Sequence, residues 1–475
     1  MTAADGPTGT RVTATRLPLV EADPGGFLPP VPKSAWLEID LDALVSNARL
    51  LAAMLPPGAR LEPVVKADAY GHGAVAVSRA LVRAGSASLG VATYDEALEL
   101  RQAGIEVPIL ILFPIPAELA PAALRHRFSI TAGDRELLGR TLSALDAEFG
   151  PASGVHDVAP LDGAALEAQP AGASGGEGDR VAVHVEVETG LGRGGVHPDE
   201  VAEAVAAISA SPYARLAGLW SHLQAAGDAL NTAGQDHRFG VASALLEATG
   251  ITLPTRHLAA SGGLLAATSG IYDVARVGIA LYGNVPDGVT VAAEHGELAA
   301  GLRPVMALRA RPIRVAWLEP GSGVSYGPSF VTDRRSRIAT LPLGYADGFP
   351  RSLSNKAGVL VRGVRAPQVG TVAMDAIMVD VTEVPGPPVT IGDEFTLLGE
   401  QGGVRISAVD VARWGNTIAH EVMAGMSGRL PRVFYAAAEA VGLRAIACES
   451  SRGSGGRDDW PRQATRHAPV PSGRD

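Results

Sequence analysis

The sequence predicts an α/β protein, a (β/α)8 TIM barrel followed by a C-terminal all-β domain. In the first part, eight apolar, strand-like runs alternate with helical stretches over roughly 220 residues, which suits such a barrel. After Tyr282 the helical spacing disappears, and short alternating segments are separated by Gly and Pro turns. A doubly wound open sheet is the alternative for the first part. It would carry a glycine-rich phosphate fingerprint after its first strand, and none is found there.

Residues 1–33 are rich in Thr, Pro and Gly and have no period, so we expect a flexible N-terminal extension. The barrel domain is expected at 34–282. Its first elements are a strand at Ser34–Ile39 and a helix at Ala43–Leu55, which Asp40 or Asp42 can cap.

The barrel strands are predicted from apolar runs, and most are followed by an amphipathic helical stretch. A Gly/Ala/Pro-rich stretch at 150–179 interrupts one connection and is interpreted as a loose surface insertion. The predicted strands are Leu61–Lys66, Ser88–Thr93, Pro108–Phe113, Phe128–Thr131, Val181–Val187, Leu216–His222, His257–Ser261 and Val274–Leu281. The predicted helices include Ala74–Ala84, Tyr94–Ala103, Asp134–Phe149 and Asp199–Ser209.

The β domain is expected at 283–440, and residues 441–475 are expected to form a polar, disordered tail. A short helix is predicted at Ala408–Arg413. The strand-like segments of this domain are Val305–Val315, Ser336–Leu343, Gly358–Val361, Ile377–Val381 and Glu394–Leu398.

Composition excludes several classes of protein. The net charge is −10, and no basic stripe with interleaved aromatics suggests a nucleic-acid partner. The single cysteine, Cys448, excludes a disulfide framework and a thiolate metal site. The first residues lack the apolar core of a secretory signal, and no segment is apolar for long enough to span a membrane. We expect a soluble, cytoplasmic protein.

Lys66 stands out because it ends the apolar run of the stretch LEPVVKADAYGHG. A lysine at the end of a buried strand is partly desolvated, which lowers its pKa towards that of a usable nucleophile. Such a lysine is a candidate Schiff-base former. The alternative is a lysine that only extends its ammonium into water from a strand end.

Polar residues collect at the C-terminal ends of the predicted strands, where barrel enzymes place their active sites. The small residues of SGG and RVGIALYG expose backbone N–H groups suited to a phosphate, although glycines at tight turns would look the same. An imine-forming lysine opposite a phosphate pocket is what pyridoxal phosphate requires. The residues at these strand ends that could form the site are Lys66, Arg193, His222, Ser261, Gly262, Arg276 and Gly278.

The order and spacing of six motifs resemble the pyridoxal-phosphate-dependent alanine racemases, a two-domain family. The likeness runs from about Trp36 to Val433. The motifs are VVKADAYGHG, HVEVETGLGRGG, RVGIALYG, GSGVSYG, PLGYADGFPR and VAMDAIMVD.

The resemblance implies a set of cofactor contacts. Lys66 would hold pyridoxal 5'-phosphate covalently, and Arg276 would face its pyridine nitrogen. A guanidinium cannot hand over a proton, so the ring stays a weaker electron sink, which suits a racemase. The residues implied around the phosphate are Tyr70, Ser261, Gly278, Ile279 and, by position, His420.

The resemblance also implies two acid–base residues, because racemisation removes a proton from one face of the α-carbon and delivers one to the other. Lys66 would serve one face and Tyr326 the other. A free tyrosine has a pKa of about 10, so it needs assistance, which the family obtains from the residues matching His222 and Arg276.

In the family the tyrosine matching Tyr326 comes from the neighbouring subunit, so a homodimer is implied. Met374 and Asp375 resemble a segment that contacts the substrate carboxylate, together with Arg193. Tyr345 resembles a gate residue over the channel to the active site.

Three positions depart from the family pattern. Glu186 stands where many members have a carbamylated lysine whose negative charge steadies the arginine matching Arg193. Glutamate supplies a carboxylate directly, although its shorter side chain changes the geometry; a solvated strand-end charge is the alternative. His420 replaces a tyrosine that contacts the phosphate, and Ala260 replaces an asparagine near the cofactor oxygen.

We therefore expect a racemase that interconverts L- and D-alanine and supplies D-alanine for cell-wall peptidoglycan. A racemase for serine or a broader range of amino acids is the alternative that His420 and Ala260 suggest. Two other classes of protein with the same barrel are further alternatives. A non-catalytic pyridoxal-phosphate protein would generally lack the β domain, and an ornithine-type decarboxylase would carry a carboxylate in place of Arg276.

Overall fold

The computed structural model describes residues 19–23, 26–150, 180–252 and 255–446. Most of the predicted N-terminal extension, the insertion predicted at 150–179 apart from its first residue, and residues 447–475 of the predicted tail lie outside this part of the chain.

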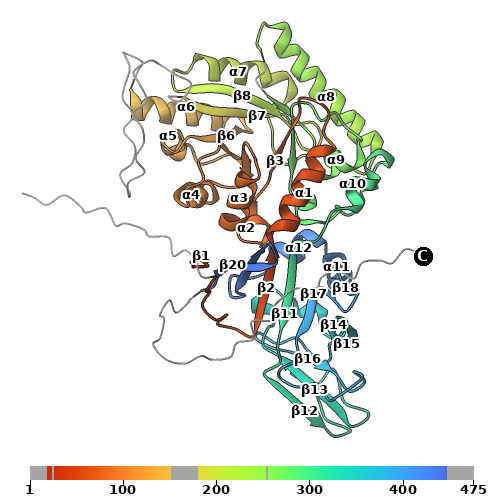
Figure 1. The fold of residues 1–475 in the computed structure, drawn as a ribbon. Helices are drawn as coiled ribbons and strands as arrows, with labels where there is room; N and C mark the ends of the chain where they lie inside the picture. The colour runs from red at the N-terminus through yellow and green to blue at the C-terminus, as the bar shows by residue number, and fades with distance from the viewer. Residues whose placement is uncertain (1–18, 24–25, 151–179, 253–254, 447–475) are drawn as a thin grey trace, which may run out of the picture.

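The first domain is a closed barrel of eight parallel strands, which confirms the predicted fold (Figure 1). Strands β4 to β9 pair in sequence order. The barrel closes because β10 pairs with β3, while the single bridges Val64–Gly90 and Ala260–Arg276 join β3 to β4 and β9 to β10. The strands are β3 (Arg60–Pro63), β4 (Leu89–Val91), β5 (Ile109–Ile111), β6 (Phe128–Ala132), β7 (Val181–Glu186), β8 (Ala214–Trp220), β9 (Arg256–His257) and β10 (Val274–Val277).

Helices follow the strands and surround them (Figure 1). Side-chain caps define several of their starts: Asp134 accepts a hydrogen bond from the Leu137 amide at 2.8 Å, and Thr93 and Glu96 form a capping box. The helices are α2 (Lys66–Tyr70), α3 (Ala74–Arg83), α4 (Tyr94–Gln102), α5 (Ala120–Arg125), α6 (Arg135–Phe149), α7 (Val201–Ala210), α8 (Ala229–Ala248), α9 (Ser261–Ala266) and the 3-10 helix η4 (Ile279–Tyr282).

The second domain is built on β-sheets, as predicted (Figure 1). One sheet has the order β1-β20-β19-β2-β11-β17-β14-β15, with β18 added to β17, and another has the order β12-β13-β16. Two of these strands, β1 (Leu19–Glu21) and β2 (Ala35–Asp40), precede the barrel in the sequence. Its strands are β11 (Met306–Ala310), β12 (Arg314–Leu318), β13 (Ser336–Leu341), β14 (Gly358–Val361), β15 (Val364–Pro367), β16 (Ile377–Asp380), β17 (Phe395–Gln401), β18 (Val404–Ile406), β19 (Arg432–Ala436) and β20 (Glu439–Arg444). Its helices include α11 (Ala408–Gly415) and α12 (Ala419–Ala424).

The strand predicted at Ser34–Ile39 exists as β2 (Ala35–Asp40), but it pairs with β11 and β19 and so belongs to the sheet of the second domain. Asp40 then caps α1 (Leu41–Ala53), accepting from the Ala43 amide at 2.9 Å. The chain therefore passes from the second domain directly into a helix packed on the barrel. Local periodicity predicted the strand but could not show a partner that lies far away in the sequence.

The ends of the described chain also differ from expectation. Residues 441–444 lie in β20 and not in a disordered tail, because Val441 and Leu443 pack inward while the strand pairs with β19. Residues 19–21, within the predicted flexible extension, form β1 (Leu19–Glu21) and pair antiparallel with β20.

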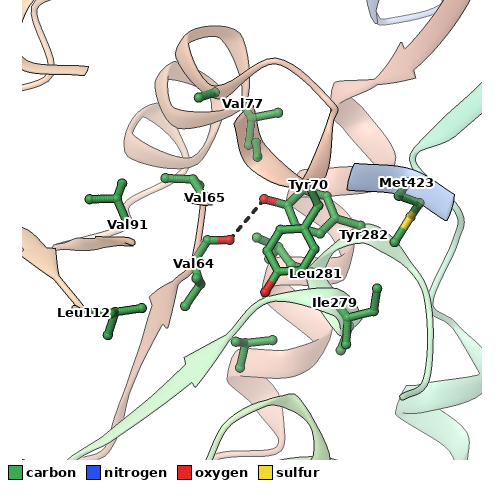
Figure 2. Packing of buried hydrophobic residues seen from close by; sticks show 14 of the residues in the cluster. Val64, Val65, Tyr70, Val77, Val91, Leu112, Ile279, Leu281, Tyr282 and Met423 are labelled. Atoms are coloured by element: carbon green, nitrogen blue, oxygen red, sulfur yellow. Dashed lines mark hydrogen bonds between the residues drawn. The ribbon is translucent and has the colours of Figure 1, made fainter. Parts of the chain in front are cut away.

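One hydrophobic core joins the two domains, and Figure 2 shows it around the segment that follows β3. Tyr70 and Tyr282 lie with ring centroids 5.0 Å apart, near Met423 of α12. The Tyr282 hydroxyl donates a hydrogen bond to the Val64 carbonyl at 3.1 Å. This packing connects the end of β3 to both η4 and the second domain.

Candidate active site

A cavity of about 1050 Å³ opens at the C-terminal ends of the barrel strands. Helix α12 of the second domain and its N-cap residue Ile418 form part of the cavity wall, the helix through His420, Glu421 and Ala424. The cavity brings together ten residues that the sequence predicted to share one site: Lys66, Tyr70, Arg193, His222, Ser261, Gly262, Arg276, Gly278, Ile279 and His420.

The sequence predicted that Lys66 is the last residue of a strand, and this prediction is wrong. Strand β3 ends at Pro63, and Lys66 begins a turn in which Ala67, Asp68, Ala69 and Tyr70 all have φ between 52° and 54°. Left-handed backbone costs roughly 1–2 kcal/mol for each such residue. Four in succession require strong support from the surroundings.

The cavity favours the neutral amine of Lys66, which is its nucleophilic form. Burial lowers its pKa, and the nearby Arg193 charge lowers it further, while Glu96 opposes the shift. Glu96 also accepts a hydrogen bond from the Ala67 amide at 2.7 Å. A larger fraction of Lys66 is therefore neutral at physiological pH than of an exposed lysine.

Arg276 is buried, and its hydrogen bonds go to carbonyl oxygens and imidazoles. It donates to the carbonyls of Ser221 at 2.6 Å and His257 at 2.9 Å. Its guanidinium lies 4.6 Å from the centre of the Trp220 ring. Burial lowers its pKa to about 10, so Arg276 stays charged at neutral pH.

His222 is held neutral beside this cation. Burial lowers its pKa to about 3, and the charges of Arg276 and Arg193 contribute. Its Nδ1 lies 3.4 Å from an Arg276 nitrogen. A guanidinium only donates hydrogen bonds, so His222 accepts at Nδ1 and carries its proton on Nε2.

Another part of the cavity wall, around Ser261, is suited to an anion. Ser261 Oγ accepts from the amides of Gly278 at 3.1 Å and Ala280 at 3.3 Å, at the point where α9 and η4 begin. A Cβ at Gly278 would lie 2.2 Å from the Tyr70 hydroxyl, so only glycine permits this approach. Burial raises the pKa of Tyr70 to about 12, which keeps the hydroxyl protonated as a donor.

His420 faces the same cavity with Nδ1 buried and without a hydrogen-bond partner in the described residues. Burial lowers its pKa and keeps the ring neutral. This nitrogen is therefore free to contact a group bound in the cavity.

Glu186 is only 5% exposed, so it is not a solvated strand-end charge. Its Oε1 lies 3.6 Å from Arg193 Nη2, and the Arg193 guanidinium lies 5.1 Å from the centre of the Phe113 ring. Burial raises the pKa of Glu186, although Arg193 and Arg276 oppose the shift.

Four predicted site residues do not line this cavity in the single chain. They lie on the second domain, where Tyr326 is 74% exposed, Met374 51% and Tyr345 43%. The Tyr345 amide donates to the Ala373 carbonyl at 3.0 Å, so two of these segments adjoin. Asp375 forms an ion pair with Arg429 at 2.5 Å.

Two buried residues near Arg276 were not predicted to belong to the site. His257 accepts from Arg276 at Nδ1, 2.8 Å away, and contacts His184 through Nε2 at 3.0 Å. Glu62 is the register partner of Arg276 in the β3–β10 pair. The signal that could have revealed Glu62 is a charged residue inside the apolar run LEPVVK.

Comparison with known proteins identifies the family. Models of the alanine racemase N-terminal and C-terminal domains match residues 39–286 and 305–434. The chain belongs to the alanine racemase family. It is thus a member of a family of isomerases, and the resemblance noted in the sequence is confirmed.

Alanine racemases of several bacteria resemble it over most of its length. The one from Nostoc sp. is 38% identical over 84% of this chain and 95% of its own, and the one from Desulfovibrio desulfuricans is 38% identical over 85% and 98%. The crystal structure of the alanine racemase from D-cycloserine-producing Streptomyces lavendulae has a TM-score of 0.73 at 34% identity, covering 86% of this chain and 98% of its own. That of the Bacillus anthracis alanine racemase with bound L-Ala-P has a TM-score of 0.74 at 29% identity, covering 88% and 98%.

Within the described residues of this alanine racemase family member, no helix combines the length and apolarity needed to cross a membrane.

Proposed function

We propose that the protein interconverts L- and D-alanine with pyridoxal 5'-phosphate as its cofactor. The observation that carries the proposal is the single cavity that Lys66 shares with the Ser261–Gly278–Tyr70 cluster and with the Arg276–His222 pair. In a member of the alanine racemase family, these are the groups that the reaction needs.

The residues present fit this cofactor. Lys66 would bind its aldehyde carbon, and Arg276 would face its ring nitrogen. Ser261 Oγ accepts two backbone amides, which leaves its hydroxyl proton to donate to the phosphate, as would Tyr70 and the Ile279 amide. The His420 ring nitrogen without a partner supplies a further contact. When bound, pyridoxal phosphate withdraws electrons from the substrate α-carbon and makes its proton acidic.

The chain's own residues would move the protons. Lys66, with its lowered pKa, would accept or donate on one face of the α-carbon. Tyr326 of a second copy of the chain would act on the other face, supported by neutral His222 and the charged Arg276 behind it. Arg193, held by Glu186, would orient the substrate side, together with Met374 and Asp375 of the second copy.

A homodimer is part of the proposal. The predicted site residues Tyr326, Met374 and Tyr345 are large and exposed in the single chain. Exposed groups of this kind typically mark a protein interface. Seating this face over the cavity of a second copy would complete both sites, with Tyr345 guarding access. We further propose that the enzyme works in the cytoplasm and supplies D-alanine for peptidoglycan.

The direct test is to incubate the purified protein with pyridoxal phosphate, reduce it with borohydride and map the labelled peptide. Chiral chromatography then measures conversion of L-alanine to D-alanine. We expect the label at Lys66 and racemisation of alanine. A protein that binds no cofactor, or a label on another lysine, would refute the proposal.

Tyr326→Phe separates a racemase from a non-catalytic carrier. Loss of an acid–base group lowers turnover by about 10²–10⁴-fold. The variant should lose turnover to this extent and keep the absorbance of the bound cofactor. A panel of L-amino acids tests specificity. Faster turnover of serine than of alanine would favour the broader racemase that His420 and Ala260 suggest.

A further inference from the structure

The turn that carries Lys66 has a backbone conformation that its own residue types do not favour. Ala67, Asp68, Ala69 and Tyr70 are left-handed, with φ from 52° to 54°, and none of them is glycine. Such residues adopt this conformation only where the surrounding structure imposes it. Within the barrel, Glu96 accepts from the Ala67 amide, and His72 Nδ1 lies 2.9 Å from the carbonyl oxygens of both Ala69 and Tyr70. The second domain supplies further contacts to the middle and the end of the turn.

Arg444, on β20, holds the middle of the turn. It is buried and forms a two-pronged pair with Asp68, with one contact from Nη1 to Oδ1 at 2.7 Å and the other from Nη2 to Oδ2. Asp68 Oδ1 also accepts from the Ala74 amide at 2.8 Å, where α3 begins. The Asp68 carboxylate thus links three parts of the structure: the turn itself, the first residue of α3 and Arg444 of the second domain.

Arg432, on β19, holds the end of the turn. Its side chain is fully buried and donates to the Gly71 carbonyl from Nε and Nη2, each at 3.2 Å. Its remaining hydrogen bonds go to the carbonyls of Met426, Ser427 and Leu430, so the guanidinium cannot turn away from Gly71 without losing them.

The two arginines form one device. Arg432 and Arg444 are direct partners in the register of the β19–β20 pair, so neighbouring strands present both guanidinium groups to the turn. The second domain also presses on the turn from nearby. A Cβ at Gly71 would lie 2.2 Å from the Met423 carbonyl oxygen, and one at Gly73 would lie 2.8 Å from the Phe434 ring.

We propose that Arg432 and Arg444 are positioning residues by which the second domain holds the Lys66 turn in its left-handed form. Neither touches the cavity. They act through Gly71 and Asp68. The position of Lys66 for binding the cofactor then depends on strands near the C-terminal end of the sequence. The inference rests on the proposed function in that Lys66 is the residue that takes the cofactor.

The test uses Arg444→Gln and Asp68→Asn in the full chain, because replacing the fully buried Arg432 risks loss of folding. Arg309→Gln is the matched control. Arg309 lies on β11 of the same sheet and pairs with Glu38 at 3.0 Å, away from the turn. Amide hydrogen exchange of residues 66–73, measured on cofactor-free protein that retains its circular dichroism spectrum, is the first readout. The Kd of pyridoxal phosphate, from absorbance, is the second.

We expect faster exchange confined to residues 66–73 and a Kd raised about tenfold in both turn variants, since a charge-assisted pair is lost. Arg444→Lys, which keeps the charge but not the fork, should recover part of the protection. The inference is overturned if folded Arg444→Gln exchanges like the wild type in this segment, or if Arg309→Gln loosens it equally. If the turn loosens but borohydride does not label Lys66, the positioning role stands and the proposed function fails.

Discussion

Replacing Glu186 by glutamine tests whether this carboxylate steadies Arg193. The atoms Glu186 Oε1 and Arg193 Nη2 are 3.6 Å apart. At an effective dielectric constant of about 20, Coulomb's law gives an upper bound of roughly 4–5 kcal/mol at such a distance. The Arg193 side chain is 41% exposed, so water screens the pair and reduces its worth to about 1 kcal/mol. We therefore expect Glu186→Gln to lower kcat/KM for alanine about fivefold, mainly through KM.

Glu186 should also affect how kcat/KM depends on pH. Burial raises the pKa of Glu186, so the carboxylate loses its charge at a higher pH than an ordinary glutamate as acid is added. The pairing with Arg193 is present above that pKa and is lost as the pH falls through it. Wild-type kcat/KM should therefore fall as the pH is lowered through the pKa of Glu186. The Glu186→Gln variant should not show this part of the decrease. Steady-state kinetics from pH 5 to 9 measure both.

Glu203→Gln is the control, because it breaks a surface pair with Arg135 at 2.6 Å, remote from the cavity. Glu186→Lys should make activity depend on added bicarbonate, since only a carbamylated lysine would be negative beside Arg193. A Glu186→Gln enzyme with the wild-type KM and an unchanged acidic limb would refute the assigned role of this pair.

Three predictions concern stability. Gly71→Ala should lower the unfolding free energy by more than about 1 kcal/mol, because Gly71 has a φ of 77° and its Cβ would meet the Met423 carbonyl; urea unfolding with Gly104→Ala, also at positive φ but in open space, measures the excess. Tyr282→Phe should cost about 1 kcal/mol in the same assay, since it removes the donor to the Val64 carbonyl, and an unchanged midpoint would contradict this. Burial raises the pKa of Glu62 above 4.5, so the folded state binds its proton more tightly than the unfolded chain. Wild-type stability relative to Glu62→Gln should therefore fall as pH rises from 4.5 through the raised pKa, and thermal melts at several pH values that show the opposite slope would refute it.

The sequence predicted the barrel well because each strand is a short apolar run and several of them are followed by polar residues at the same end. That regularity predicts that Lys66, His222 and Arg276 share one site, and all three line the cavity. Local pattern was sufficient here, since parallel strands meet at one end of a barrel.

The conformation of Lys66 could not be predicted in this way. Its left-handed turn depends on Arg432 and Arg444, which lie on strands near the other end of the chain. The sequence also did not predict that β2 belongs to the second domain, because its partners β11 and β19 are remote in sequence. Glu62 was read as part of an apolar run, although it faces the interior beside Arg276.

The path of the chain through β2 has a consequence for biosynthesis. This strand is translated before the barrel, yet its two neighbours in the sheet, β11 and β19, are translated after it. Until the ribosome has released them, β2 presents two bare edges that invite association with other nascent chains. A premature stop between β11 and β19 would leave one of these edges permanently open, and we expect such a product to aggregate even though its barrel is complete.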